Sequence, residues 1–121
     1  MNDLIVMFLT GAFVYPLTEL LFRKRTHISM ALAGGLACML LHGLFSTYPM
    51  SFPVKFIVSS ALITAIEFIF GFIVNIKLKL GVWDYSKLKY NYKGQICPLF
   101  SVLWGFFSIP ITFMSNFVSL F

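Results

Sequence analysis

Charge is scarce in this chain of 121 residues, which has nine Lys and Arg, four Asp and Glu, and 11% charged residues in total. A typical soluble domain is about 25% charged. Hydrophobic residues make up 60% of the chain, and the mean hydropathy is +0.92. This composition excludes a soluble globular domain, a disordered tail and a nucleic-acid-binding protein. We therefore expect the net charge of +5 to lie at the edge of a membrane.

Reactive and metal-binding residues are also few. Two cysteines do not make a disulfide framework, and together with two histidines they match no metal-site spacing. These residues are Cys38, Cys97, His27 and His42. The sequence contains no Gly-x-x-x-x-Gly-Lys-Ser/Thr phosphate loop, so any ATP hydrolysis must come from a separate subunit. We expect no metal ion and no cofactor.

Long apolar runs account for most of the chain. A transmembrane helix needs about 20 consecutive apolar residues, and four segments qualify. They cover residues 4–22, 28–45, 54–76 and 96–120. The segments are apolar on all sides, whereas a barrel strand alternates over about 10 residues. The sequence therefore predicts an all-α integral membrane protein, with four transmembrane helices forming one bundle over residues 1–121.

Proline positions refine this prediction. Pro16 and Pro110 lie inside the first and fourth segments, where a missing N–H group is expected to kink the helix. Pro98 is expected in the first turn of the fourth helix, where the missing donor costs little.

The basic residues indicate the orientation. Eight of the nine Lys and Arg residues lie in the connections 23–27 and 77–95. Because short cytoplasmic connections are enriched in Lys and Arg, both connections are predicted to face the cytoplasm. Four spans then place both termini outside.

Small and polar residues recur on one face of each segment, at spacings of three or four residues. The stripes comprise Gly11, Tyr15 and Glu19; Gly34, Cys38 and His42; Glu67, Gly71 and Asn75; and Ser101, Gly105 and Ser108. Such residues gather inside a bundle, where glycine lets two helices approach closely. We expect His42 to be a hydrogen-bonded packing residue.

Glu67 is the strongest candidate for a functional residue. It lies near the middle of the third segment, and no Lys or Arg stands within one turn. An ionised side chain there costs from about 2.5 to more than 10 kcal/mol, so Glu67 must face protein or water rather than lipid. Two interpretations remain: a site for a proton, a cation or a cationic substrate, or a neutral acid that is hydrogen-bonded between helices.

Further candidates gather on the predicted cytoplasmic side. Glu19 and Arg23 stand one turn apart, as in a helical salt bridge, and His27 begins the next helix nearby. The remaining candidates for substrate or ion binding are Asn75, Asp84, Asn91 and Gln95. Together they would form a polar pocket open to the cytoplasm, or they would satisfy one another and fix the bundle.

Aromatic residues and lysines fill the last connection. Trp83, Tyr85, Tyr90 and Tyr92 are predicted to anchor it at the headgroup level. The interspersed lysines would attract anionic lipid. Residues 83–97 are expected to fold back against the helix ends, because Asp84 can accept backbone donors in a tight turn and Gly94 lets the chain turn.

The chain resembles the CmpB-like family of bacterial membrane proteins, which are classed as ABC-transporter type IV permeases. The resemblance covers nearly the whole chain. It rests on Tyr15-x-x-x-Glu19-Leu20-Leu21-x-Arg23, Thr26-His27-x-Ser29-Met30-Ala31-x-Ala33-Gly34-Gly35-Leu36, Glu67-Phe68-x-x-Gly71-x-x-x-Asn75, Trp83-Asp84-Tyr85-Ser86, Asn91, Gly94-Gln95-Ile96-Cys97-Pro98, Ser101 and Trp104. It implies a multi-pass protein of the bacterial cytoplasmic membrane.

The expected function is that of a permease-like transport component for a small solute. Since four spans are few for a permease, we expect a homo-oligomer in the lipid bilayer, with a separate ATPase subunit as a further partner. The alternative is a non-transport module that binds a lipid headgroup or a partner protein at its cytoplasmic face. A third reading, an intramembrane enzyme using Glu67 or Asp84, lacks a nucleophile–base pair. We expect no catalysis.

Overall fold

Helices dominate the computed structural model, which describes residues 2–23 and 27–118. Within the first helix, the side chains of residues 2, 18, 19, 22 and 23 lie outside that description. The elements are α1 (Asn2–Arg23), α2 (Ile28–Thr47), α3 (Phe52–Gly71), the π-helix η1 (Phe72–Lys77), α4 (Pro98–Phe106) and α5 (Ser108–Val118). The described residues hold no β-strand beyond an isolated bridge between Tyr92 and Ile96, which confirms the all-α class.

Three helical stretches are long and apolar enough to cross a membrane: Ile28–Thr47, Phe52–Lys77 and Pro98–Val118. In α1 the apolar helical stretch is shorter, covering Asp3–Leu17. The described residues therefore support a multi-pass membrane protein, with three of the four predicted spans meeting the length criterion.

The fourth predicted helix is interrupted. The sequence predicted one kinked helix over 96–120, whereas α4 ends at Phe106 and α5 begins at Ser108. Pro110 explains the break, because a proline ring clashes with the carbonyl of the residue four positions earlier, here Phe106. The N–H of Phe107 donates instead to the Trp104 carbonyl at 3.1 Å, which tightens the turn. Unlike this segment, α1 continues as a helix past Pro16.

The third helix also ends differently from the prediction. After Gly71 the chain widens into η1, and the Leu78 N–H donates to the carbonyl of Ile73, five residues earlier, at 2.9 Å. Six residues of π-helix are unusual, and such segments are frequent near functional sites. Asn75 lies within η1 and directs the chain into the segment formed by residues 78–97.

The predicted close packing of glycines is confirmed for α1 and α2. A Cβ atom on Gly34 would lie only 2.7 Å from the Cβ of Tyr15, and one on Gly35 would lie 2.7 Å from the Phe8 carbonyl oxygen. Gly11 faces the Gly34 carbonyl in the same way. These contacts bring the two helices together and fix Tyr15 against α2.

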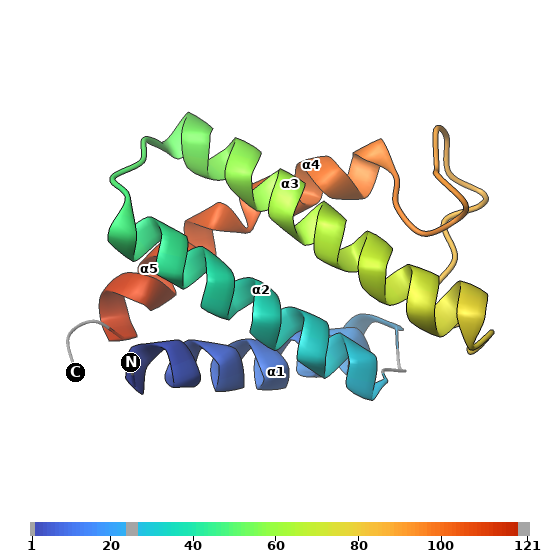
Figure 1. The fold of residues 1–121 in the computed structure, drawn as a ribbon, viewed down its shortest axis with the longest axis horizontal. Coiled ribbons are helices and arrows are strands. Elements are labelled where there is room, and N and C mark those ends of the chain that lie inside the picture. The colour runs from blue at the N-terminus through green and yellow to red at the C-terminus, as the bar shows by residue number, and fades with distance from the viewer. Residues whose placement is uncertain (1, 24–26, 119–121) are drawn as a thin grey trace.

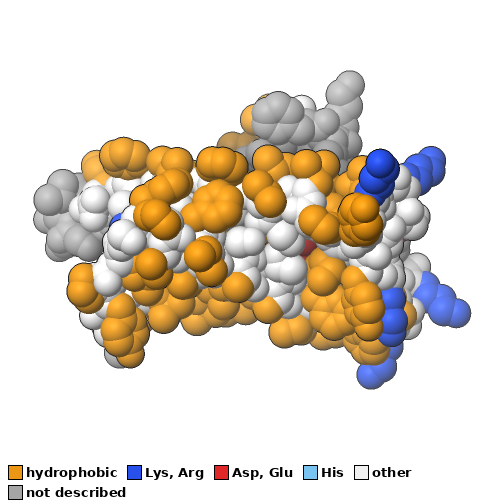
Figure 2. All heavy atoms as spheres, turned by 90° about the horizontal axis from the view of Figure 1, so that it is seen from above, with side chains coloured by type: hydrophobic (Ala, Val, Ile, Leu, Met, Phe, Trp, Pro, Cys, Tyr) orange, Lys and Arg blue, Asp and Glu red, His pale blue; other side chains and the backbone are white. Residues whose placement is uncertain are grey.

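The two ends of the molecule differ in charge. The start of α1 and the end of α5 lie at one end, and the 78–97 segment lies at the other (Figure 1). Described Lys side chains gather mostly at the latter end, while hydrophobic side chains cover most of the face between in this view (Figure 2). This distribution fits a protein embedded in a bilayer with one basic edge.

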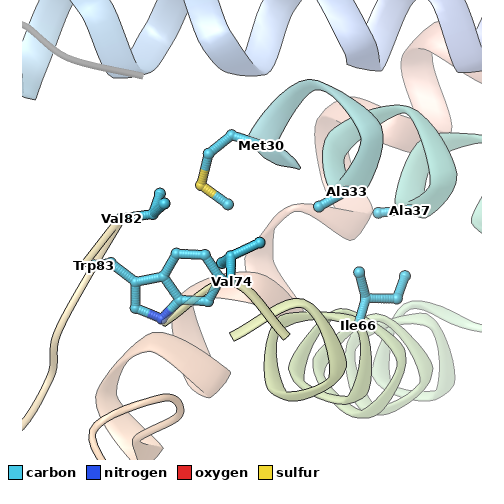
Figure 3. Close-up of a cluster of buried hydrophobic side chains, with 7 residues drawn as sticks. All are labelled: Met30, Ala33, Ala37, Ile66, Val74, Val82 and Trp83. Carbon is cyan, nitrogen blue, oxygen red and sulfur yellow. The ribbon is translucent and has the colours of Figure 1, made fainter. Parts of the chain in front are cut away.

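A hydrophobic core connects the helices to the 78–97 segment. Met30, Ala33 and Ala37 of α2 meet Ile66 of α3 and Val74 of η1. Val82 and Trp83 complete this cluster from the 78–97 segment (Figure 3). The segment is therefore part of the folded body rather than a free loop.

Candidate functional site

Glu67 lies on the inner face of α3, with 8% of its surface exposed. The Tyr85 hydroxyl donates to its Oε2 atom at 2.6 Å, and the Trp104 indole N–H donates to its Oε1 atom at 3.2 Å. We call these three residues the Glu67 cluster. The Glu67 carboxylate thus accepts hydrogen bonds from one residue of the 78–97 segment and one residue of α4. Its side chain therefore faces protein rather than lipid, as predicted.

Each donor is itself held in position. The N–H group of Tyr85 donates to the Gly94 carbonyl at 2.7 Å, and its ring stacks on Phe100 at 4.6 Å between centroids. Burial raises the pKa of Tyr85, and the Glu67 carboxylate raises it further. The tyrosine therefore stays protonated and remains a donor. Trp104 packs edge-on against Tyr15 of α1, with ring centroids 6.2 Å apart.

Glu67 is one of the residues that line a cavity of about 160 Å³. All five α-helices contribute to its wall, and most of the lining side chains are apolar. The lining residues are Gly11, Val14, Tyr15, Met30, Ala33, Gly34, Ala37, Cys38, Ile63, Ile66, Glu67, Trp104, Phe107, Pro110, Ile111 and Met114. Of the six predicted binding residues whose side chains the structure describes, Glu67 alone lies in this wall.

Asn75 and Gln95 bind each other instead. The Asn75 side-chain amide donates to the Gln95 Oε1 atom at 2.8 Å, and its Oδ1 atom accepts the Val82 N–H at 2.6 Å. The Trp83 indole N–H donates to the Gln95 carbonyl at 3.0 Å. These bonds fasten the 78–97 segment to η1, so the predicted folding back of this segment is confirmed.

Asp84 and Asn91 shape the tip of the same segment. The Oδ1 atom of Asp84 accepts the Ser86 N–H at 2.9 Å, which forms the expected tight turn. Asn91 accepts the Gly94 N–H at 2.9 Å and donates to the Leu88 carbonyl at 2.8 Å. Gly94 has a φ of +74°, and a Cβ there would lie 2.6 Å from the Asp84 Oδ1 atom. The side chains of Asp84 and Asn91 therefore stabilise the tip of the 78–97 segment through hydrogen bonds within it.

The cluster predicted around Glu19, Arg23 and His27 is only partly described. The side chains of Glu19 and Arg23 lie outside the described residues, so their predicted salt bridge does too. His27 is the N-cap of α2, where its Nδ1 atom accepts the Ser29 N–H at 3.1 Å. Within the described part of the chain, a capping contact thus accounts for His27.

The four predicted anchors divide into two pairs. Trp83 is only 4% exposed and Tyr85 is half-buried, and the polar atoms of both bind protein groups. Long-range contacts thus supply both residues with polar partners inside the protein, and their place at the headgroup level stays a prediction. Tyr90 and Tyr92 are 85% and 53% exposed, as an interfacial anchor requires.

Sequence reasoning missed a second polar cluster. The Nε2 atom of His42 lies 2.7 Å from Oδ2 of Asp3, and its Nδ1 atom lies 2.5 Å from the Ser115 hydroxyl. We call these residues the His42 cluster; they join α1, α2 and α5. His42 was expected to be a hydrogen-bonded packing residue, but nothing in the local pattern indicated its partners, which are 39 and 73 residues away.

Comparison with known families assigns the chain. The sequence profile of the family described as "Putative ABC-transporter type IV" matches residues 4–120. The chain belongs to this family. The resemblance noted in the sequence is thereby confirmed. No match was found among curated proteins or among solved structures.

Three of the residues that carried the resemblance to the ABC-transporter type IV family meet in the structure. Tyr85 comes from the Trp83–Ser86 motif, Glu67 from the third helix, and Trp104 from α4. In this member of the family, all three belong to the Glu67 cluster. The other motif residues, Asn75, Asn91 and Gln95, hold the segment that carries Tyr85.

Proposed function

We propose that the protein is a membrane-embedded transport component that carries a small solute through the cavity beside Glu67. In this proposal α1 also spans the bilayer, which completes four spans. The basic connections face the cytoplasm of a bacterial cell, and both termini face outward. The protein takes part by binding and moving the solute, without catalysis.

One observation supports the proposal above the others. A buried carboxylate lies at mid-length of a membrane-span-like helix, next to a cavity walled by all five α-helices. Ionisable groups at membrane depth are costly, and they commonly mark substrate or ion pathways. Membership in an ABC-transporter family agrees with a transport-related role.

The proposal includes partners. Four spans enclose little space for a continuous pathway, so we propose that several copies assemble in the bilayer. Since the sequence lacks a phosphate loop, energy from ATP would enter through a separate ATPase subunit. Crosslinking in native membranes, followed by mass spectrometry, would identify both kinds of partner.

Flux measurements test the transport role. Purified protein is reconstituted into lipid vesicles loaded with a panel of benzene-sized solutes: cationic benzylammonium, neutral benzyl alcohol and anionic benzoate. We expect faster release of at least one solute than from protein-free vesicles, and Glu67→Gln should abolish this gain. Asp3→Asn, which alters a carboxylate outside the cavity, is the matched control. Equal release with and without protein for every solute would refute the role.

Cysteine labelling tests the orientation. In a variant with Cys38 and Cys97 replaced by serine, Ser46→Cys should react with an impermeant reagent added to intact cells, whereas Ser86→Cys should not. Reaction at position 86 from outside would reverse the proposed topology.

A second candidate function rests on the basic end of the molecule. Five lysines are exposed, one just before the 78–97 segment and four within it: Lys77, Lys79, Lys87, Lys89 and Lys93. Each lysine near a membrane surface adds about 1 kcal/mol of attraction to anionic lipid. A module that binds an anionic headgroup or an acidic partner protein would use this surface.

Lipid dependence separates this candidate from transport. If the surface binds anionic headgroups, anionic lipid should raise the unfolding temperature in detergent. A Lys87→Gln, Lys89→Gln, Lys93→Gln variant should then lose most of that increase. An equal rise in both proteins would leave the basic surface without this function.

A further inference from the structure

We infer that the cavity beside Glu67 binds a small apolar cation, an ammonium group attached to an apolar body about the size of benzene. The inference rests on the proposed function in one respect, since it takes this cavity as the solute site. It adds the chemical class of the solute, which follows from the charge, shape and lining of the cavity.

The charge of the site is incomplete. Both described partners of the Glu67 carboxylate, Tyr85 and Trp104, are neutral donors. Among the described residues that line the cavity there is no Lys, Arg or His. An ionised carboxylate has about four acceptor positions, and these two bonds occupy two of them. An ammonium group would supply the counter-charge that stabilises an ionised Glu67, and the remaining acceptor positions fit its N–H donors.

The aromatic lining supports the same charge. Tyr15, Trp104 and Phe107 all contribute to the cavity wall, and Trp104 also contacts Glu67 directly. Faces of aromatic rings attract cations, with tryptophan the most favourable. A cation beside Glu67 is therefore attracted both by the carboxylate and by the neighbouring rings.

The size and polarity of the cavity limit the rest of the solute. An apolar protein cavity of about 150 Å³ is known to bind benzene, and this cavity measures about 160 Å³. A sugar or another polyhydroxylated solute needs several converging polar groups, which the mostly aliphatic wall does not supply. Anionic solutes are disfavoured by the Glu67 carboxylate. A compact apolar body with one positive group satisfies all these conditions.

Binding measurements in detergent test the inference directly. Isothermal titration calorimetry compares benzylammonium with benzyl alcohol, which has nearly the same shape but no charge. For the wild-type protein at pH 7 we expect at least tenfold tighter binding of benzylammonium. Glu67→Gln should remove this preference while benzyl alcohol binds as before. Asp3→Asn should retain the preference.

The pair of ligands keeps the test decisive if the Glu67→Gln variant fails to fold, because the wild-type protein alone gives the comparison. Equal binding of the two ligands, or no binding of benzylammonium, would overturn the inference. The vesicle experiment is independent. Flux of benzyl alcohol or benzoate without benzylammonium binding would support the transport role but refute the inferred preference for a cation. Selective benzylammonium binding supports the cation whether or not flux is found.

Discussion

The Glu67 cluster and the His42 cluster each join one central polar side chain to two partners from other parts of the chain. In the His42 cluster an imidazole stands between Asp3 and Ser115, so both ring nitrogens are engaged, and His42 is only 1% exposed. In the Glu67 cluster the carboxylate stands between two neutral donors and borders a cavity. The first arrangement uses both nitrogens of its central ring, whereas the central residue of the second belongs to the wall of a cavity.

This difference distinguishes buried polar groups that hold the helices together from a buried polar group that can also bind a ligand. Saturated buried groups specify how helices meet, because each loses a partner if the helices shift. The carboxylate of the Glu67 cluster is held in place by its donors but retains capacity for a ligand. Variants of the His42 cluster should therefore mainly lower stability, whereas variants of the Glu67 cluster should mainly weaken ligand binding.

The largest loss of stability is expected from His42→Ala. The substitution removes two hydrogen bonds, leaves the Ser115 hydroxyl buried without its partner and opens a void, at a cost of about 2 kcal/mol. Thermal unfolding in detergent measures it. Benzylammonium affinity should stay within about twofold of the wild-type value, since none of the His42 cluster lines the cavity. If His42→Ala keeps its stability but loses affinity for benzylammonium, the two clusters do not differ in the predicted way.

Glu67→Gln should have the reverse profile. Glutamine keeps one acceptor oxygen, so only one of the two donors loses its partner, at a cost of about 1 kcal/mol. The preference for benzylammonium should disappear. If this variant unfolds at as low a temperature as His42→Ala in the same detergent, the predicted difference between the two clusters is wrong.

Tyr85→Phe sharpens the comparison further. The phenylalanine ring can still stack on Phe100, so the change isolates the hydroxyl that donates to Glu67. Interhelical hydrogen bonds in membrane proteins contribute about 0.6 kcal/mol on average, and we expect a loss of that size. A double-mutant cycle with Glu67→Gln measures the coupling. Strictly additive losses would show that the hydroxyl and the carboxylate do not interact.

The smallest effect concerns the pH dependence of the His42 cluster. Asp3 precedes the predicted first span, and its hydrogen bond with His42 lowers the pKa of Asp3 from 3.8 to about 2. A lowered pKa stabilises the folded protein above the ordinary value, and this contribution is lost as the pH falls from about 4 to about 2. Asp3→Asn should therefore show a smaller decrease in unfolding temperature between pH 5 and pH 2.5. Parallel curves would mean that the bond with His42 does not affect stability.

Local pattern sufficed to predict much of the fold. Apolar segments gave the helices to within a few residues, and the glycines at 11, 34 and 35 lie where helices touch. The position of Glu67 at membrane depth was enough to exclude a lipid-facing side chain. Asp84 and Gly94 indicated the turn that folds residues 83–97 back, because these signals depend only on neighbouring residues.

Other features depend on the mutual rotation of helices and could not be predicted in the same way. From the sequence alone, Tyr85 is typical of a headgroup anchor. The structure shows that its hydroxyl donates to the buried Glu67 carboxylate. Asp3, His42 and Ser115 lie on three helices, and no spacing along the chain relates them. The π-helix at 72–77 arises where residues 78–97 bind back to Asn75, which is a tertiary effect rather than a local preference.

The sequence separations within the His42 cluster bear on how the protein is assembled during synthesis. Asp3 and His42 are both present once the second helix has been synthesised, whereas Ser115 lies 73 residues beyond His42 and is the last of the three to be made. Until α5 has been made, His42 lacks the partner of its Nδ1 atom. Synthesis of α5 would thus supply this partner, and chains truncated before α5 would contain a histidine without it.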